Sequence, residues 1–426
     1  LFRRAYCQQA VCSPSRTSLM TGARPDTTRV YDLETHFRTT MGDRVVTLPQ
    51  LFKQHGWFVQ GMGKLYHGGL DDPASWSVPW SSPKISHGTY ARPENRAIVE
   101  RKRAETRERI ARGLRPSRAR DYGPAWECAD VPDSTYHDGA LADMAIEALR
   151  AIAQQRQPFW LGVGFIRPHL PFVAPKKYWD LYDRDAIALA PNPFPPRGAP
   201  PYAVPPGGEL RTYEGIPADR ILPDDLARTL KHGYYAAVSY MDAQFGRVLD
   251  ELERLGLHTN TIIVVWGDHG WKLGEHAAWC KHTNVELDTR VPLIVSVPGM
   301  RHAGRATDAL VEFVDLYPTL ADLCGLPLPD HLEGTSFRPV LENPDRPWKR
   351  AAFSQYPRSH EGRSLMGYSM RTERYRLTMW VDRQHPERVD AIELYDYETD
   401  PQGNQNIADR PEMAELVRRL TAQLRA

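Results

Sequence analysis

Five short segments of the chain carry side chains that can bind or transform an anion. Each lies near the end of a predicted helix or strand, where side chains are held in fixed positions. One such segment alone usually has a structural role, but five at separate elements favour a site for an anionic ester. The segments are CSPSR with Cys12 and Arg16, GKLYH with Lys64 and His67, RPHLPF with His169, GDHG with Asp268 and His269, and GEHAAWCKH with Lys281.

The residue types suit hydrolysis of such an ester. Free N–H groups and the helix dipole stabilise an anion at a helix N-terminus. Lysines and a metal ion offset charge on the transferred group and on the leaving oxygen. Histidines exchange protons near neutral pH. Asp268 and His269 could ligate a divalent cation through oxygen and nitrogen, although capping of the next turn is the more frequent role of such a pair.

Cys12 allows several interpretations. Ser13 before Pro14 fits an N-cap followed by proline at the first helical position, and Gly22 ends the short helix that follows. A thiolate at that helix terminus would be activated. A thiol protease would also need a positioned histidine and its orienting group, and the surroundings of Cys12 carry no local signature of one. An ordinary buried cysteine is the third possibility.

The rest of the chain predicts an α/β fold. Strands alternate with helices, which indicates a large, mostly parallel sheet flanked by helices, with ligands beyond the carboxyl ends of the strands. From about residue 348 the pattern changes to half-exposed antiparallel strands and a final helix over 411–425. We therefore predict a catalytic domain over 1–347 and a smaller α+β subdomain over 348–426. The main predicted elements are a strand near Phe58, helix 138–153, strand 159–165, helix 223–255, and buried strands in TIIVVW and VPLIVSVPG.

Composition excludes several classes of protein. The chain has 426 residues, 41% hydrophobic and 25% charged, with a formal net charge of +1, which argues against a nucleic-acid or membrane-surface binder. No apolar run approaches the ~18 residues of a membrane span. Five irregularly spaced cysteines give no disulfide framework. The arginine-rich segment 94–120 could bind an anionic polymer, but its interleaved glutamates favour a solvated helix.

The motifs together resemble the sulfatase family. CSPSR matches its C-x-P-x-R signature, and the Thr21-Gly22 pair completes the usual continuation. With GKLYHGG, IRPHLPF, GDHGWKLGEHAAWCKHTN, SMRTERYRLTMW and ELYDYETDPQGNQNIA, the chain is most similar to the iduronate-2-sulfatase branch over nearly its whole length. The resemblance implies an alkaline-phosphatase-like fold and hydrolysis of a sulfate ester on a sulfated sugar or uronic acid.

The resemblance also implies roles for individual residues. Cys12 would be oxidised by a formylglycine-generating enzyme to Cα-formylglycine, whose hydrate supplies the nucleophilic oxygen and contacts one calcium ion. Arg16 would stabilise that hydrate, and Lys64 would bind sulfate. The other implied roles are calcium ligation by Asp268 and His269, deprotonation of the hydrate by His67, and sulfate binding with protonation of the leaving alcohol by His169 and Lys281. The hydrate would form a sulfated hemiacetal, and loss of its second hydroxyl proton would then expel sulfate.

One part of the family pattern lies outside the sequence. The family takes two further calcium ligands from an Asp-Asp pair upstream of the cysteine motif, and this sequence begins after that point. We expect a fragment of a longer, exported protein (periplasmic, extracellular or lysosome-like), and weak calcium binding by this chain on its own. The sequence does not indicate an oligomeric state.

Two other functions stay open at this point. A phosphoester or phosphonate hydrolase of the same superfamily can share the fold and the nucleophile. A non-catalytic protein could bind anionic polysaccharide through segment 94–120, in which case Cys12 would remain a thiol. The expected partners of a sulfatase are a sulfated saccharide and the maturing enzyme, with no nucleic acid and no membrane span.

Overall fold

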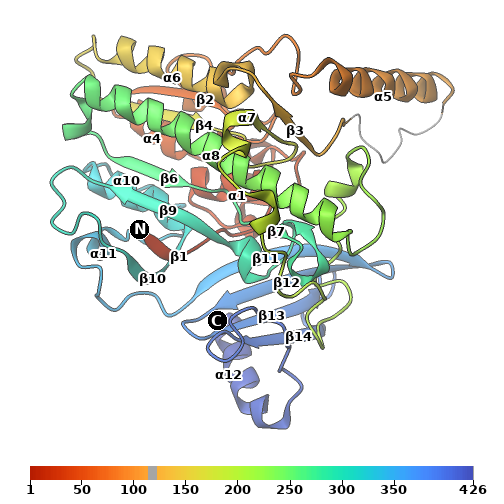
Figure 1. Ribbon diagram of the computed structural model, residues 1–426. Coiled ribbons are helices and arrows are strands. Elements are labelled where there is room, and N and C mark those ends of the chain that lie inside the picture. The colour runs from red at the N-terminus through yellow and green to blue at the C-terminus, as the bar shows by residue number, and fades with distance from the viewer. Residues whose placement is uncertain (114–121, 426) are drawn as a thin grey trace.

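A four-stranded sheet lies at the centre of the computed structural model, which describes residues 1–113 and 122–425 (Figure 1). Its strand order is β10 (Thr307–Glu312), β1 (Phe2–Tyr6), β9 (Arg290–Ser296) and β6 (Ile263–Trp266). Strand β1 is parallel to β10, whereas β9 is antiparallel to both β1 and β6. The expected α/β class is confirmed, but this sheet is mixed rather than mostly parallel.

The direction of β9 corrects the sequence prediction. Between β6 and β9 the chain forms only short elements, so it returns without the helical crossover that a parallel neighbour uses. The apolar run of β9 had also indicated a fully buried strand, and this prediction is wrong. Val291, Leu293 and Val295 are buried, while the alternate residue Ile294 is 44% exposed. One face of β9 is therefore open, as is common for antiparallel strands.

Two parallel pairs lie beside this sheet. Strand β2 (Phe58–Gly63) pairs with β4 (Phe159–Gly164), and β3 (Trp126–Ala129) pairs with β5 (Phe172–Pro175). Because β2 and β4 are parallel and in register, the loops that follow them leave at the same edge, and the Lys64 N–H donates to the Gly164 carbonyl at 2.7 Å. Two segments with predicted site residues therefore start side by side.

Long helices cover these strands. Helices α6 (His137–Ile152) and α8 (Asp224–Arg254) lie against each other, and α8 also packs on β5 (Figure 1). Their buried residues recur at helical spacing, which places one apolar stripe on the core. The shorter elements are α2 (Pro25–Thr28), α3 (Phe37–Met41), α4 (Leu48–Gln54), α7 (Lys176–Trp179), α9 (Glu286–Thr289), α10 (Leu316–Leu323), α11 (Arg338–Glu342), β7 (Lys272–Leu273) and β8 (Trp279–Cys280).

Helix α1 (Cys12–Thr21) begins earlier than the sequence predicted. Cys12 is its first residue, and the N-cap is Val11, whose side chain caps no backbone N–H, so Ser13 is not the cap. The other end agrees with the prediction, because Gly22 closes the helix with φ of +68° in the left-handed region. All ten helical residues are buried. The N-terminus of α1 thus presents Cys12 inside the protein.

The C-terminal strands form the predicted antiparallel sheet, in the order β11 (Ala352–His360), β12 (Arg363–Arg371), β13 (Tyr375–Asp382) and β14 (Val389–Asp396). Helix α12 (Ala414–Arg425) packs on this sheet through its apolar face. The boundary between 347 and 348 stays a prediction, although this sheet lies wholly on its C-terminal side.

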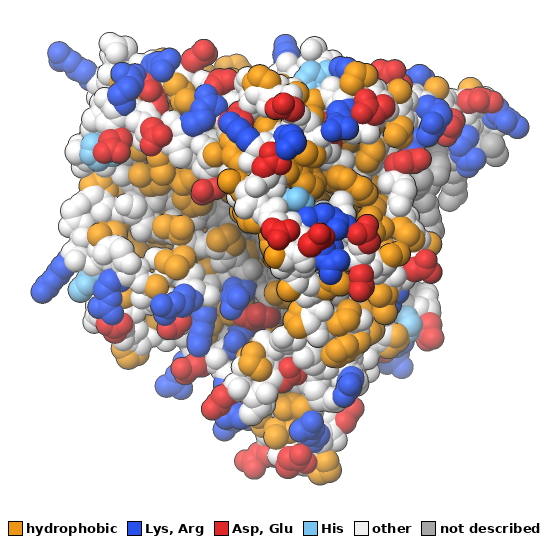
Figure 2. Space-filling view, viewed as in Figure 1, with side chains coloured by type: hydrophobic (Ala, Val, Ile, Leu, Met, Phe, Trp, Pro, Cys, Tyr) orange, Lys and Arg blue, Asp and Glu red, His pale blue; other side chains and the backbone are white. Residues whose placement is uncertain are grey.

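The basic segment forms α5 (Pro93–Ala111), which extends from the body of the molecule (Figure 1). No residue of α5 is buried, and Arg101 lies 3.8 Å from Glu105. On the face shown in Figure 2, basic and acidic side chains alternate at this end. These features agree with a solvated helix; residues 114–121 of the segment lie outside the described part. Within the described residues, no helix is both long and apolar enough to cross a membrane.

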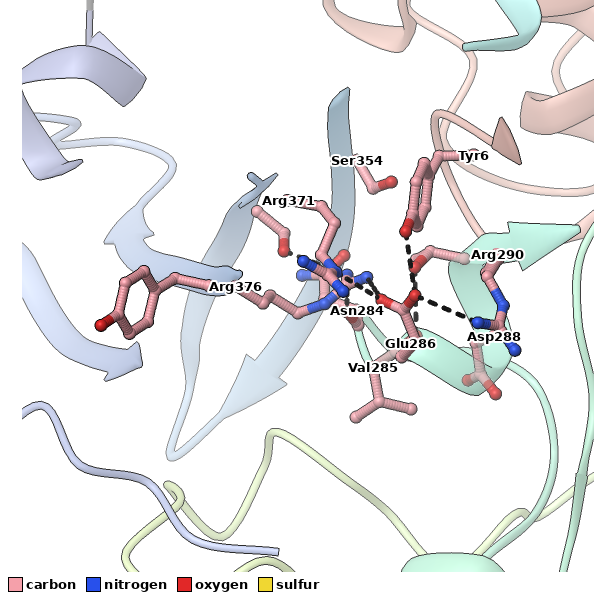
Figure 3. Close-up of polar contacts among 12 residues, drawn as sticks. Tyr6, Asn284, Val285, Glu286, Asp288, Arg290, Ser354, Arg371 and Arg376 are labelled. Atoms are coloured by element: carbon pink, nitrogen blue, oxygen red, sulfur yellow. Dashed lines mark hydrogen bonds and ion pairs between the residues drawn. The ribbon is translucent and has the colours of Figure 1, made fainter. Parts of the chain in front are cut away.

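An ion network joins the C-terminal sheet to the segment between β6 and β9 (Figure 3). The Glu286 carboxylate accepts hydrogen bonds from Arg371 Nε at 3.0 Å, from Arg376 Nη2 at 2.5 Å and from the Tyr6 hydroxyl at 2.9 Å. Burial opposes ionisation of Glu286, but the two arginines outweigh it and lower its pKa to about 2. This carboxylate anchors two cations that are themselves buried.

We expect Glu286→Gln to destabilise the fold by about 3 kcal/mol, because it leaves buried cations without a counter-charge. Urea unfolding at neutral pH measures the loss. The difference in unfolding free energy between wild type and Glu286→Gln should shrink as the pH falls from 4.5, the ordinary pKa of a glutamate, toward about 2, the pKa of Glu286 in the folded protein. Over this range wild type loses the charge of Glu286, which the variant lacks at every pH. The exposed Glu387→Gln variant is the control and should unfold like wild type. Equal stability of wild type and Glu286→Gln at neutral pH would show that the network contributes nothing.

Candidate active site

Cys12 lies at the centre of the groups that the sequence singled out. Its side chain is buried, with 3% of the residue exposed, at the N-terminus of α1. The sulfur lies 3.4 Å from His269 Nε2 and 3.4 Å from Lys64 Nζ. Burial opposes ionisation of the thiol, and so does Asp268, but Lys64, Lys281 and His269 together hold its pKa well below the usual range. The position is therefore suited to a negatively charged or strongly polar group.

Asp268 and His269 follow β6, at the carboxyl end of that strand. The Asp268 carboxylate accepts a hydrogen bond from Arg16 Nε at 2.8 Å, and Arg16 also donates to the carbonyls of Lys64 and Leu65. Burial opposes ionisation of Asp268, but Arg16, His269 and Lys64 keep its pKa well below the usual range. Arg16 thus fixes the acid and the start of the Lys64 loop to the same helix.

Three of these residues could hold a metal ion. Ligand atoms of Cys12, Asp268 and His269 all lie within 4.8 Å of one another. His269 Nδ1 lies 2.9 Å from the Gly270 carbonyl, which leaves Nε2 for the centre of the group. An ionised carboxylate and an imidazole fit a divalent cation, and a residue-12 oxygen in place of the sulfur would fit it better. Calcium takes six to eight oxygen ligands, so it would need groups besides these three.

His169 and Lys281 form a second part of the site. Lys281 Nζ lies 2.9 Å from His169 Nε2 and 4.6 Å from the centre of the Trp271 ring. His169 Nδ1 lies 2.7 Å from the Leu170 carbonyl. Burial lowers the pKa of His169, and the charge of Lys281 lowers it further. The imidazole is thus held by its neighbours on both ring nitrogens.

His67 is the one predicted site residue that the contacts do not bring to this group. It follows Lys64 on the loop after β2. Among the described residues, its Nδ1 is shielded from solvent without a hydrogen-bond partner, and no contact joins His67 to Cys12. Its role in releasing the product stays a prediction.

Sequence reasoning missed two contributors, Glu209 and Trp271. The Glu209 carboxylate forms ion pairs with Lys281 at 2.7 Å and with His169 at 2.9 Å. The Trp271 ring contacts the rings of both His169 and His269. Glu209 comes from an irregular, proline-rich stretch, in which no periodicity marks a single acid. Trp271 stands two residues after His269, and this closeness in the sequence was the only signal that could have placed it near the site.

The assembled site can bind a tetrahedral anion and act on it. Two lysines act on the residue at position 12 from different loops: Lys64 contacts it and is half-buried, and Lys281 is buried and acts on it through its charge. An anion there would meet positive charge and the N-terminus of α1. His169 lies against Lys281 and can exchange a proton with a leaving oxygen.

Comparison with known proteins identifies the family of this chain. The family model described as "Sulfatase" matches residues 1–326, and the model "N-sulphoglucosamine sulphohydrolase, C-terminal" matches residues 274–426. The chain is 36% identical to iduronate 2-sulfatase of Mus musculus, with 96% of this chain and 84% of that protein covered. It is 35% identical to iduronate 2-sulfatase of Homo sapiens, with 99% and 86% covered.

Solved structures share the fold. A protein in complex with its substrate, D-glucosamine-2-N,6-O-disulfate, has a TM-score of 0.74 at 22% identity and covers 100% of this chain and 89% of its own. Phosphonate monoester hydrolase from Silicibacter pomeroyi has a TM-score of 0.72 at 22% identity, with 99% and 87% covered. The family model and the relatives together establish that this chain belongs to the sulfatase family and is a hydrolase similar to iduronate 2-sulfatase.

Proposed function

We propose that the chain hydrolyses a sulfate ester on a 2-O-sulfated uronic acid of a glycosaminoglycan, with Cα-formylglycine at position 12 and a calcium ion. The observation that carries the proposal is the contact of Cys12 with both Lys64 and His269 at the N-terminus of α1. A maturing enzyme would convert the thiol to the aldehyde.

In its hydrated form, the aldehyde would supply one hydroxyl group that attacks sulfur and displaces the alcohol, and a second hydroxyl group whose deprotonation would then expel sulfate. Lys64 and Lys281 bind the sulfate oxygens and offset their charge. His169, in contact with Lys281, gives a proton to the leaving alcohol oxygen. Arg16 holds Asp268 and the Lys64 loop in place through its hydrogen bonds.

Asp268 and His269 would hold the calcium ion together with an oxygen of residue 12. When bound, the ion polarises sulfate oxygens and favours the ionised form of the attacking hydroxyl. Arg16 beside Asp268 keeps that carboxylate ionised and oriented.

The substrate class is supported by the relatives. Both iduronate 2-sulfatases are more than 30% identical to this chain over most of their length. A solved structure described as a 2-O GAG sulfatase has a TM-score of 0.67 at 21% identity, which supports the fold alone. These matches identify the family and the fold, so the sugar needs a direct test.

Rates on an aryl sulfate and on the matching aryl phosphate test the reaction class. We expect kcat/KM for the sulfate to exceed that for the phosphate by at least about 10²-fold, because the site is complementary to one transferring group. A preference for the phosphate would instead identify a phosphoester or phosphonate hydrolase. Disaccharides with a 2-O-sulfated iduronate or a 6-O-sulfated glucosamine then test the sugar, and faster release from the second would overturn the uronic-acid assignment.

A further inference from the structure

A single carboxylate connects the groups that would meet the leaving oxygen. Glu209 Oε2 lies 2.7 Å from Lys281 Nζ, and Glu209 Oε1 lies 2.9 Å from His169 Nε2. His282 Nε2 lies 3.9 Å from the same carboxylate. Only 2% of the Lys281 side chain and 21% of the Glu209 side chain are exposed. Lys281 is therefore buried, whereas Glu209, His169 and His282 are partly exposed.

The charges of this group depend on Glu209. Burial opposes ionisation of Glu209, but Lys281, His169 and His282 hold its pKa well below the usual range. Burial also opposes the charge of Lys281, yet Glu209 and Cys12 raise its pKa above the usual value. Without the carboxylate, Lys281 would lose the partner that orients its ammonium group beside His169.

The segment that carries Glu209 is fixed to the strand before Lys281. Gly207 has φ of +83°, and a Cβ at that position would lie 2.3 Å from the Trp279 carbonyl oxygen. Leu210 is fully buried in a cluster with Trp279 and Cys280 of β8. Glu209 and Lys281 are thus held by two segments packed backbone to backbone, so their contact does not depend on a free loop.

We propose that Glu209 is a positioning residue that orients Lys281 and His169 toward the sulfate and the leaving oxygen, which rests on the proposed function. Its charge has a second consequence. The Glu209 carboxylate cancels part of the attraction of Lys281 and His169 for sulfate, so it weakens binding of the sulfate product. At the same time, it speeds turnover by orienting these two groups. A purely structural residue would not have these opposite effects.

The test compares Glu209→Gln with wild type for kcat, KM and inhibition by inorganic sulfate. We expect kcat to fall about 10²-fold, because the proton donor and the lysine lose their orientation. We expect sulfate to bind about tenfold more tightly, because a like charge facing it has been removed. Glu214→Gln is the control: it changes a carboxylate of the same stretch that pairs with Lys102, outside the site, and should match wild type.

The pH profile gives an independent readout. Glu209 raises the pKa of both His169 and Lys281, so its loss lowers both, and the alkaline limb of kcat/KM should move to lower pH. The substitution leaves in place the other groups that act on this pair, which are Lys64, Cys12, Cys280, Trp271 and His282.

Each outcome decides the proposal. Unchanged kcat in Glu209→Gln overturns it, and so does a lower kcat with weaker sulfate binding and a lower melting temperature. If Glu209→Gln does not fold, Glu209→Asp keeps the charge one methylene short, and it should lose turnover while sulfate binds as in wild type. If wild type hydrolyses no sulfate ester, the proposed function fails, and calorimetry with sulfate still tests whether Glu209 opposes anion binding.

Discussion

Replacing Cys12 with alanine is expected to lower kcat for sulfate esters by at least about 10⁴-fold, because the nucleophile is lost and only charge stabilisation remains. The cysteine side chain is small, and every residue of α1 is buried, so we expect the fold to persist. Turnover of an aryl sulfate by purified variants, with circular dichroism to check folding, measures the effect.

A matched control exists in the same chain. Cys324→Ala removes a partly buried thiol next to α10, whose pKa is raised by burial and which has no part in the site. It should keep the wild-type rate. Activity of Cys12→Ala within tenfold of wild type would exclude position 12 as the source of the nucleophile.

Replacing Asp268 with asparagine is expected to lower kcat/KM about 10³-fold, because charge stabilisation of the transferring group is lost. Asp268 is the only carboxylate among the described residues that could share a metal with position 12. The substitution also leaves Arg16 without its charged partner inside the protein. Both effects act on the reacting centre.

Calcium dependence separates these two effects. After chelation, we expect high concentrations of calcium to restore wild-type activity, since this chain on its own is expected to bind the ion weakly. The half-saturating concentration should be at least about 10²-fold higher still in Asp268→Asn. The exposed Asp308→Asn variant, which affects only a surface pair with Arg3, should respond like wild type. An unchanged calcium requirement in Asp268→Asn would remove this residue from the metal site.

Much of the site could be predicted because its residues follow elements with strong patterns. The run before Asp268 reads as a buried strand, and the strand before His169 has the same character. Since side chains beyond strand ends meet at one edge, the motifs could be grouped from the order of residues alone. Lys64 and Cys12 do lie in contact, as that grouping requires.

Other features depend on tertiary packing and could not be predicted. Glu209 is a single acid in an irregular segment, and its place is decided by Leu210 and Gly207 packing on β8. The antiparallel direction of β9 follows from the path of the chain before it, which carries site residues and only short elements instead of a long crossover helix. Local capping preference also failed at Ser13, because α1 begins at Cys12.

Mass spectrometry of the tryptic peptide 5–16 tests the central claim most directly. The peptide contains Cys7 as well as Cys12, so Cys7 serves as an internal control thiol. In protein from a host with the maturing enzyme, we predict one alkylated cysteine, Cys7, and a residue 12 about 18 Da lighter than cysteine, as expected for an aldehyde. Two alkylated cysteines in that peptide would contradict the proposed mechanism.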